Sequence, residues 1–335
     1  MTNKIVLTGI KPTGIPHIGN WLGAIRPALA LAGLPNTEAR YFIADYHALT
    51  VVHDAAALRQ MTYDVAATWL ALGVDPARTL IYRQSDVPEV FELNWILACM
   101  TSKGWMNKMH AYKAAVDRAH GAGEQDVDAG INIGLYTYPV LMAADILLFD
   151  SHLVPVGKDQ VQHVEIARDI AQRINHVFGD VLTLPEAHVL SDVAVIPGLD
   201  GRKMSKSYGN VIPLFSPPNQ LKKTINKIVT DSTPPEVPKD PEASLIFQIY
   251  RAVASTEQTQ QLSDRYRTGI GWGEAKGALF EALEGALAPA RERYVALMAE
   301  PREIDTILAS GADRARAIAR QTLSRVRAAI GVGRP

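Results

Sequence analysis

Short apolar runs alternate with amphipathic stretches over the first two thirds of the chain. Runs with the length and composition of buried strands occur at 4–8, 40–45, 79–83 and 154–157. Apolar residues at helical spacing follow them at 21–32, 54–72, 90–101 and 157–174. Alternating strands and helices predict a Rossmann-like α/β domain, in which helices cover both faces of a parallel sheet.

The pattern changes after Asn210. Prolines at 213, 217 and 218 mark a boundary, and a proline-rich connection spans 231–241. Amphipathic helices are then predicted at 218–229, 243–254, 258–267, 274–298 and 312–330. We therefore expect an α/β domain over residues 1–212 and an α-helical domain over residues 213–335. Periodicity alone does not distinguish a helical RNA-reading domain from a helical protein-interaction module.

Composition narrows the class of protein. A chain of 335 residues with 47% hydrophobic and 21% charged residues is typical of a globular protein with a sizeable core. The net charge of -1 argues against a strongly basic, nonspecific nucleic-acid binder, so no DNA partner is expected. The single cysteine, Cys99, excludes an internal disulfide and a cysteine-cluster metal site. The early polar N-terminus and the short apolar run near 140–149 predict a cytoplasmic protein without a membrane segment.

One loop carries an unusual set of donors. Residues 201–210 place Lys203 and Lys206 three positions apart, with serine hydroxyls beside them and glycines at both flanks. Such a loop suits a phosphate group whose negative charge grows during a reaction, because donors aimed at developing charge are a large term in catalysis. Taken by itself, it is equally well described as a solvated basic turn.

A second phosphate site is predicted near the N-terminus. A strand, a loop rich in glycine and proline, and a helix follow one another, a geometry that places a phosphate at the helix N-terminus. Gly19 allows close approach to the backbone, while His17 and Asn20 offer side-chain donors. The alternative for His17 is a local hydrogen bond at the start of a helix.

A solitary carboxylate, Asp145, lies in an apolar and aromatic helical stretch. Burying it without a donor is costly, so it needs a protein or ligand N–H or O–H. Tyr138 and Met142 share its helix face at helical spacing, which suits an aromatic ligand with one polar hydrogen. His47 follows a predicted strand and faces the same region.

The helix that begins at Gly157 carries further polar residues. Lys158 and Asp159 at its start are placed to hold a ribose or an ammonium group. Gln160 and His163, three positions apart, point toward the same cavity. The alternative is an ordinary capped helix.

Together these segments resemble a known family. The string Lys-Met-Ser-Lys-Ser at 203–207 is similar to the second signature of class I aminoacyl-tRNA synthetases, and residues 12–20 resemble the first, with Asn20 in place of its last histidine. Residues 138–147 and 154–163 look like those of bacterial tryptophanyl-tRNA synthetases. Lys11 departs from the pattern, since many members have glutamine there.

The resemblance implies a tryptophan–tRNA ligase that forms tryptophanyl-adenylate from ATP and then charges tRNA(Trp). His17, Asn20, Lys203 and Lys206 would be catalytic, and Mg²⁺ would be bound only through the ATP phosphates. The residues expected to bind ATP are Lys11, Pro12, Thr13, Gly19, Asn20, Gly157, Lys158, Asp159, Lys203, Met204, Ser205, Lys206 and Ser207. Those expected to bind tryptophan are Asp145, Tyr138, Met142, Gln160, His47 and His163. The adenine contact is expected near 194–196.

The family also implies a homodimer, with anticodon reading in the helical domain and the last helix folded back on the α/β domain. Three alternatives remain at this point. A tyrosine-specific relative fits, because Asp145 would also accept a phenolic O–H. A nucleotidyltransferase with the class I fold is a second alternative, but such an enzyme reads no anticodon and would not need the long helical part. A non-catalytic paralogue does not explain the intact His17 and the two lysines.

Overall fold

The computed structural model describes residues 3–14, 16–128, 130–189 and 196–333, without the side chain of Asp159. A five-stranded sheet has the order β3-β2-β1-β4-β5, and every pairing is parallel. The strands are β1 (Lys4–Ile10), β2 (Thr37–Ile43), β3 (Leu80–Arg83), β4 (Leu153–Val156) and β5 (Glu186–Val189). The chain moves outward on one side of β1 through β2 and β3, and on the other through β4 and β5. The direction in which strands are added therefore reverses between β1 and β4, and we call this place the reversal point. In open parallel sheets, ligands bind at the reversal point, at the carboxyl ends of the strands.

Helices surround the sheet and then form the rest of the chain. The helices that alternate with the strands along the chain are α1 (Ile18–Asn20), α2 (Arg26–Ala32), α3 (Asp45–Ala48), α4 (Ala55–Ala71), α5 (Glu89–Met100), α6 (Lys103–Met106), α7 (His110–Gly121), α8 (Ile133–Leu147) and α9 (Val161–Phe178). They are followed by α10 (Pro218–Asn226), α11 (Leu245–Arg251), α12 (Thr256–Thr268), α13 (Trp272–Ala299) and α14 (Pro301–Ile330). Short helical turns are η1 (Trp21–Ile25), η2 (Gln84–Asp86), η3 (Lys158–Gln160) and η4 (Lys206–Tyr208).

The sequence predictions of fold class and of four strands are confirmed. The parallel sheet and its helical layers are present, and α4 begins after Asp54, whose side chain accepts the Ala57 N–H at 2.8 Å. The predicted strand 40–45 ends at Ile43, and Asp45 instead opens α3. Strand β5 was not predicted, because its sequence Glu-Ala-His-Val mixes polar and apolar residues.

Two hydrophobic clusters follow from the alternation of side chains along the strands. Tyr41 and Ile43 face α2 and α4, in a cluster that continues without a break into α10, α11 and α13. Phe42 and Leu7 face α5, α8 and α9. The core on one face of the sheet therefore extends into the helical half of the chain.

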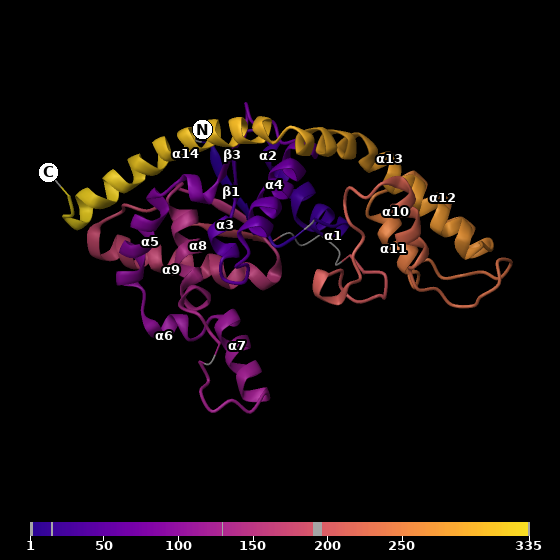
Figure 1. Ribbon diagram of the computed structural model, residues 1–335, viewed down its shortest axis with the longest axis horizontal. Coiled ribbons are helices and arrows are strands. Elements are labelled where there is room, and N and C mark those ends of the chain that lie inside the picture. Colours follow the sequence, from indigo (N-terminus) through magenta and orange to yellow (C-terminus); the bar gives the residue numbers. More distant parts are fainter. Residues whose placement is uncertain (1–2, 15, 129, 190–195, 334–335) are drawn as a thin grey trace.

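The final helix differs from its prediction. A helix over 312–330 was expected, but α14 begins at Pro301 and runs along β3 and α5 (Figure 1). Gly311 lies inside it at the point of closest approach, where a Cβ would lie 1.8 Å from the Ile81 carbonyl oxygen. Arg316 and Arg320 pair with Glu89 of α5 at 3.1 and 3.0 Å. Within the described residues, no helix is long and apolar enough to cross a membrane.

Candidate active site

A cavity of about 500 Å³ opens at the reversal point of the sheet, beside the carboxyl ends of β1 and β4. Its wall is mainly apolar, with a few polar groups, as is common for small-molecule sites. The lining residues from the two strands and the segments after them include Gly9, Lys11, Val154, Val156 and Gly157. From other elements come Phe42, His47, Tyr138, Met142, Ile146 and Gln160.

Asp145 lies behind this wall rather than in it. Its side chain is buried, and Asp145 is not among the described lining residues of the cavity. Gln84 Nε2 lies 2.8 and 2.9 Å from its two carboxylate oxygens, and His47 Nε2 lies 2.9 Å from Oδ2. Burial raises the pKa of Asp145, while the hydrogen bonds from His47 and Gln84 act in the opposite direction.

His163 lies behind Tyr138, just as Asp145 lies behind the cavity wall. The Tyr138 hydroxyl and His163 Nε2 are 2.6 Å apart, and His163 is 3% exposed. Four of the six residues predicted to contact tryptophan, namely Tyr138, Met142, Gln160 and His47, line the cavity. The other two, Asp145 and His163, each hydrogen-bond to one of those lining residues.

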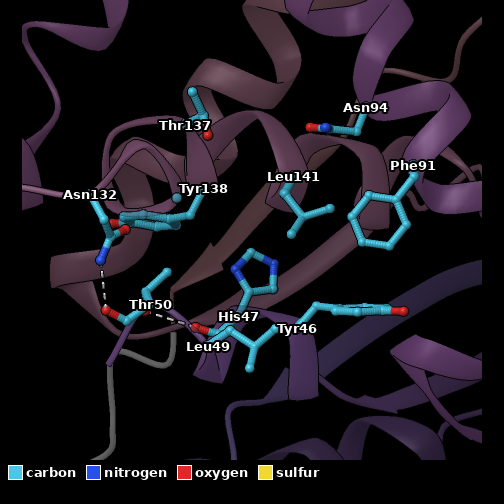
Figure 2. Close-up of a pocket in the computed structure, with 11 residues that line it drawn as sticks. Tyr46, His47, Leu49, Thr50, Phe91, Asn94, Asn132, Thr137, Tyr138 and Leu141 are labelled. Carbon is cyan, nitrogen blue, oxygen red and sulfur yellow. Dashed lines mark hydrogen bonds between the residues drawn. The ribbon is translucent and has the colours of Figure 1, made fainter. Parts of the chain in front are cut away.

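A smaller cavity of about 280 Å³ adjoins the first (Figure 2). The two share His47, Thr50 and Tyr138, so these side chains separate them. Figure 2 shows the His47 ring among the residues of the smaller cavity, whose other lining residues include Tyr46, Leu49, Phe91, Asn94, Asn132, Thr137 and Leu141.

The predicted N-terminal signature forms a short helix start beside the first cavity. His17 is the residue before α1, and its backbone N–H donates to Asn20 Oδ1 at 3.0 Å. A Cβ on Gly19 would lie 2.9 Å from His17 Nδ1, so the glycine leaves room for the ring. Burial and the nearby Lys206 charge lower the pKa of His17 to about 4. The imidazole is therefore neutral near pH 7.

The lysine loop lies directly against this segment. The Ile18 N–H donates to the Ile212 carbonyl at 3.0 Å, and the Leu214 N–H donates to the Pro16 carbonyl at 3.0 Å. Lys206 Nζ lies 3.3 Å from the Thr13 carbonyl oxygen. Thr13 is two residues after Lys11, which lines the main cavity. The Lys206 ammonium therefore lies beside the segment that forms the cavity rim.

The buried side chain of Asn210 hydrogen-bonds to several residues of the lysine loop. Its Oδ1 accepts the Ser205 N–H at 2.8 Å, and its Nδ2 donates to Asp200 at 2.7 Å and to the Lys203 carbonyl at 3.2 Å. A Cβ on Gly198 would lie 2.2 Å from Asn210 Nδ2, so any larger residue at position 198 would collide with the Asn210 side chain. These bonds fix the backbone between the two lysines.

The other predicted ATP contacts differ in how they are placed. Lys203, Lys206 and Ser207 are exposed, and Ser205 and Ser207 have their hydroxyl oxygens 2.8 Å apart. Met204 is 4% exposed, its side chain packs in the core, and its N–H donates to the Ile196 carbonyl at 3.1 Å. Pro12 is buried, whereas Gly157 and Lys158 are exposed beside the cavity. The Asp159 side chain and residues 194–195 lie outside the described part, so only Ile196 of the expected adenine region is described.

One residue of this arrangement was not predicted. Gln84 bonds Asp145 from a position 61 residues away, and no local motif marks it. Its place directly after the strand run 79–83 was the only available signal, because polar residues at the carboxyl ends of parallel strands often face a site. Among the described residues, no group of three or more His, Cys, Asp or Glu is arranged to hold a metal ion.

The chain is similar to known proteins along nearly its whole length. The family model described as tRNA synthetases class I (W and Y) matches residues 2–288. The tryptophan–tRNA ligase of Pseudomonas aeruginosa is 55% identical over 335 residues, covering 99% of this chain and 74% of the relative. That of Neisseria meningitidis is 52% identical and covers 99% of both chains. The crystal structure of the Campylobacter jejuni tryptophanyl-tRNA synthetase complexed with ADP and tryptophan has a TM-score of 0.89 and 44% identity, covering 98% of this chain and 100% of that one.

Proposed function

The chain belongs to the class I tRNA synthetases of the tryptophan and tyrosine branch, and we propose a role for each part of its site. Its activity is that of an ATP-dependent tryptophan–tRNA ligase. The observation that supports the assignment of roles is the contact between Lys206 and Thr13, beside the cavity lined by Lys11. It brings a phosphate-binding loop to the mouth of an apolar pocket.

The reaction has two steps. An oxygen of the tryptophan carboxylate attacks the α-phosphorus of ATP, the bond to the β-phosphate bridging oxygen breaks, and pyrophosphate leaves. A ribose hydroxyl of the terminal adenosine of the tRNA then attacks the carbonyl carbon of the mixed anhydride, the bond from that carbon to the phosphate oxygen breaks, and AMP leaves while the hydroxyl proton is released. Alignment and charge neutralisation supply most of the acceleration of the first step.

The loop stabilises the charge that develops on pyrophosphate. Lys203 and Lys206 would bind the leaving phosphates of ATP, which arrives as its magnesium complex. His17 is neutral near pH 7 because its pKa is lowered to about 4, so it would act as a hydrogen-bonding group rather than as a cation. Asn20 holds the backbone of His17 and thereby orients this segment. The adenosine would lie along Gly19 and the start of η3 at Gly157 and Lys158.

The apolar cavity would hold the tryptophan side chain. Asp145 has about four lone-pair positions on its two oxygens. Gln84 and His47 make three close contacts with these oxygens, which leaves one acceptor position unused. Because Asp145 lies behind the cavity wall, the indole N–H would reach this position after the side chains between the carboxylate and the cavity shift. Met142 and Phe42 would pack on the indole ring, and Tyr138 and Gln160 would hold the polar end of the amino acid.

Selection of the amino acid tests this assignment. ATP–pyrophosphate exchange would be measured with tryptophan, with tyrosine and with 1-methyltryptophan, which lacks the indole N–H. A site with a buried acceptor disfavours a ligand that leaves it unpaired, so kcat/KM for the methylated analogue should fall by at least about a hundredfold. Tyrosine should be activated far less well than tryptophan. Exchange that is insensitive to N-methylation would refute the role of Asp145.

The helical part and the dimer belong to the same proposal. The helical part, residues 213–335, would read the anticodon of tRNA(Trp), and the protein would act in the cytoplasm, where it serves translation. Large apolar side chains are exposed on neighbouring elements, with Trp95 at 71%, Ile133 at 75% and Phe91 at 40%. Phe91 and Trp95 lie one turn apart on α5. Exposed apolar groups of this kind mark contact sites, and we propose a second copy of the chain as the partner.

A further inference from the structure

Gln84 is a buried amide whose two ends are both engaged. It is 1% exposed and begins η2, directly after β3. Its Oε1 accepts the Tyr46 backbone N–H at 3.2 Å, and its Nε2 donates to both oxygens of Asp145, at 2.8 and 2.9 Å. Because the oxygen is held by a backbone donor, the amide nitrogen is the end that faces the carboxylate.

The residues on either side of Gln84 fix its position. The Ser85 N–H donates to Asp45 Oδ1 at 3.0 Å, and the Ser85 hydroxyl bonds the other oxygen of the same carboxylate. Arg83 pairs with Asp86 at 2.8 Å and with Asp305 of α14 at 3.4 Å. The segment is therefore held from α3 on one side and from α14 on the other.

The chemistry of Asp145 makes this amide important. Burial favours the protonated carboxyl, which would present a donor where the indole N–H needs an acceptor. His47 also bonds Asp145, through a ring nitrogen whose donor or acceptor role depends on the tautomer, and the buried Tyr82 is the other described titratable group that interacts with this carboxylate. An amide N–H₂ does not titrate between about pH 5 and 9, so it remains a donor to the carboxylate throughout that range.

We propose that Gln84 is a positioning residue for tryptophan. Its amide keeps the Asp145 carboxylate ionised and oriented so that one acceptor position remains for the indole N–H. The inference rests on the proposed contact between Asp145 and the indole. It adds a residue that touches no substrate and acts through another side chain.

Two variants of the 335-residue chain test the role. Gln84→Met keeps the length of the side chain but removes the donors, and Gln84→Glu places a second carboxyl beside Asp145. In exchange assays at pH 7.5, both should raise KM for tryptophan by about tenfold to a hundredfold, the loss expected for one hydrogen bond to a charged group. The KM for ATP and kcat at saturating tryptophan should change by less than about threefold. Gln260→Met, which removes a surface bond to Asp264, is the matched control.

The pH dependence separates positioning from a merely structural role. In Gln84→Met, KM for tryptophan should rise as pH falls from 8.5 to 6, because Asp145 protonates more readily without the amide. In Gln84→Glu it should fall over the same range, because a shared proton restores a donor between the two carboxyls. Parallel pH profiles for the two variants would overturn the proposal, as would an unchanged KM. Thermal unfolding of each variant measures any loss of fold separately.

The analogue 1-methyltryptophan distinguishes this inference from the proposed function. If the unmodified protein accepts the analogue as well as tryptophan, the contact between Asp145 and the indole is wrong, and the role of Gln84 fails with it. If the unmodified protein rejects the analogue and Gln84→Met rejects it equally strongly, only the inference about Gln84 is wrong. Reduced rejection by Gln84→Met supports it.

Discussion

Lys206 reaches back across the site to Thr13, with its ammonium nitrogen 3.3 Å from the carbonyl oxygen of that residue. The two residues are 193 positions apart, and their contact joins the lysine loop to the segment that follows β1. A Cβ on Gly14 would lie 3.3 Å from the same ammonium, so the loop fits closely against this backbone. The ammonium is thus available at the place where the phosphates of ATP are expected.

Removing this charge should slow the chemical step more than it weakens binding. Lys206→Ala is expected to lower kcat for ATP–pyrophosphate exchange by about a hundredfold to a thousandfold, the range for one donor to developing charge. The KM for tryptophan should stay within about threefold, since the cavity is unchanged. Lys223→Ala, an exposed lysine on α10, is the control. Exchange that is unaffected by Lys206→Ala would exclude a catalytic role for the loop lysine.

His17 should contribute to the pH dependence of stability. Its pKa is about 4 in the folded chain and about 6.5 in the unfolded chain, so the unfolded chain binds more protons between these values. The free energy of unfolding should therefore fall as pH decreases from 6.5 to 4, and the contribution of His17 is fully present above pH 6.5.

Urea unfolding at several pH values measures this effect as a difference between variants. His17→Gln should show a shallower decrease between pH 6.5 and pH 4 than the unmodified protein, because the other titrating groups are common to both. His120→Gln, on the exposed end of α7, should follow the unmodified protein. Equal slopes for all three proteins would mean that His17 is solvated in the folded state.

Much of the sheet could be predicted because buried strands leave a local signal. The runs at 4–8, 40–45, 79–83 and 154–157 correspond to β1 to β4, and the helical spacing between them gave the parallel architecture. β5 escaped prediction because its residues are only half-buried and mixed in polarity. The start of α14 escaped it because Gly311 resembles a helix break, whereas a close approach to Ile81 requires the glycine.

Site residues could be predicted only where their spacing along a single helix shows that they share one face. Tyr138 and Met142 share a helix face and both line the cavity, as their spacing indicated. Spacing gave no information on what stands opposite that face, so Gln84 was missed and the bond between Asp145 and His47 was not foreseen. Both partners come from segments that follow other strands, His47 from α3 after β2 and Gln84 from η2 after β3, so their approach to α8 depends on the tertiary fold.

The contact between Gly311 and Ile81 predicts how α14 is fixed to the sheet edge. Gly311→Ala should destabilise the protein by more than about 1 kcal/mol, because the new methyl group would lie 1.8 Å from a backbone oxygen and one element must shift. Gly277→Ala in α13 is the matched control, since among the described residues no heavy atom beyond its chain neighbours and its own helix backbone lies within 4 Å of its Cβ position. That control should be stabilised by about 0.5–1 kcal/mol. Thermal unfolding that ranks the two variants in the opposite order would contradict the packing of α14.

Trp95 is the side chain on which the proposed dimer is most directly tested. It is 71% exposed on α5, one turn from Phe91, and Phe91 lines the smaller cavity beside Leu49, which is 46% exposed. A charge at the centre of an apolar contact between two copies would be desolvated without a partner, so Trp95→Asp should convert a dimer into a monomer at micromolar concentration. Sedimentation velocity measures this, with Val295→Asp on α13, 58% exposed in the native chain, as the control. An unmodified protein that sediments as a monomer would refute the dimer, and a dimeric Trp95→Asp would place the interface on another face.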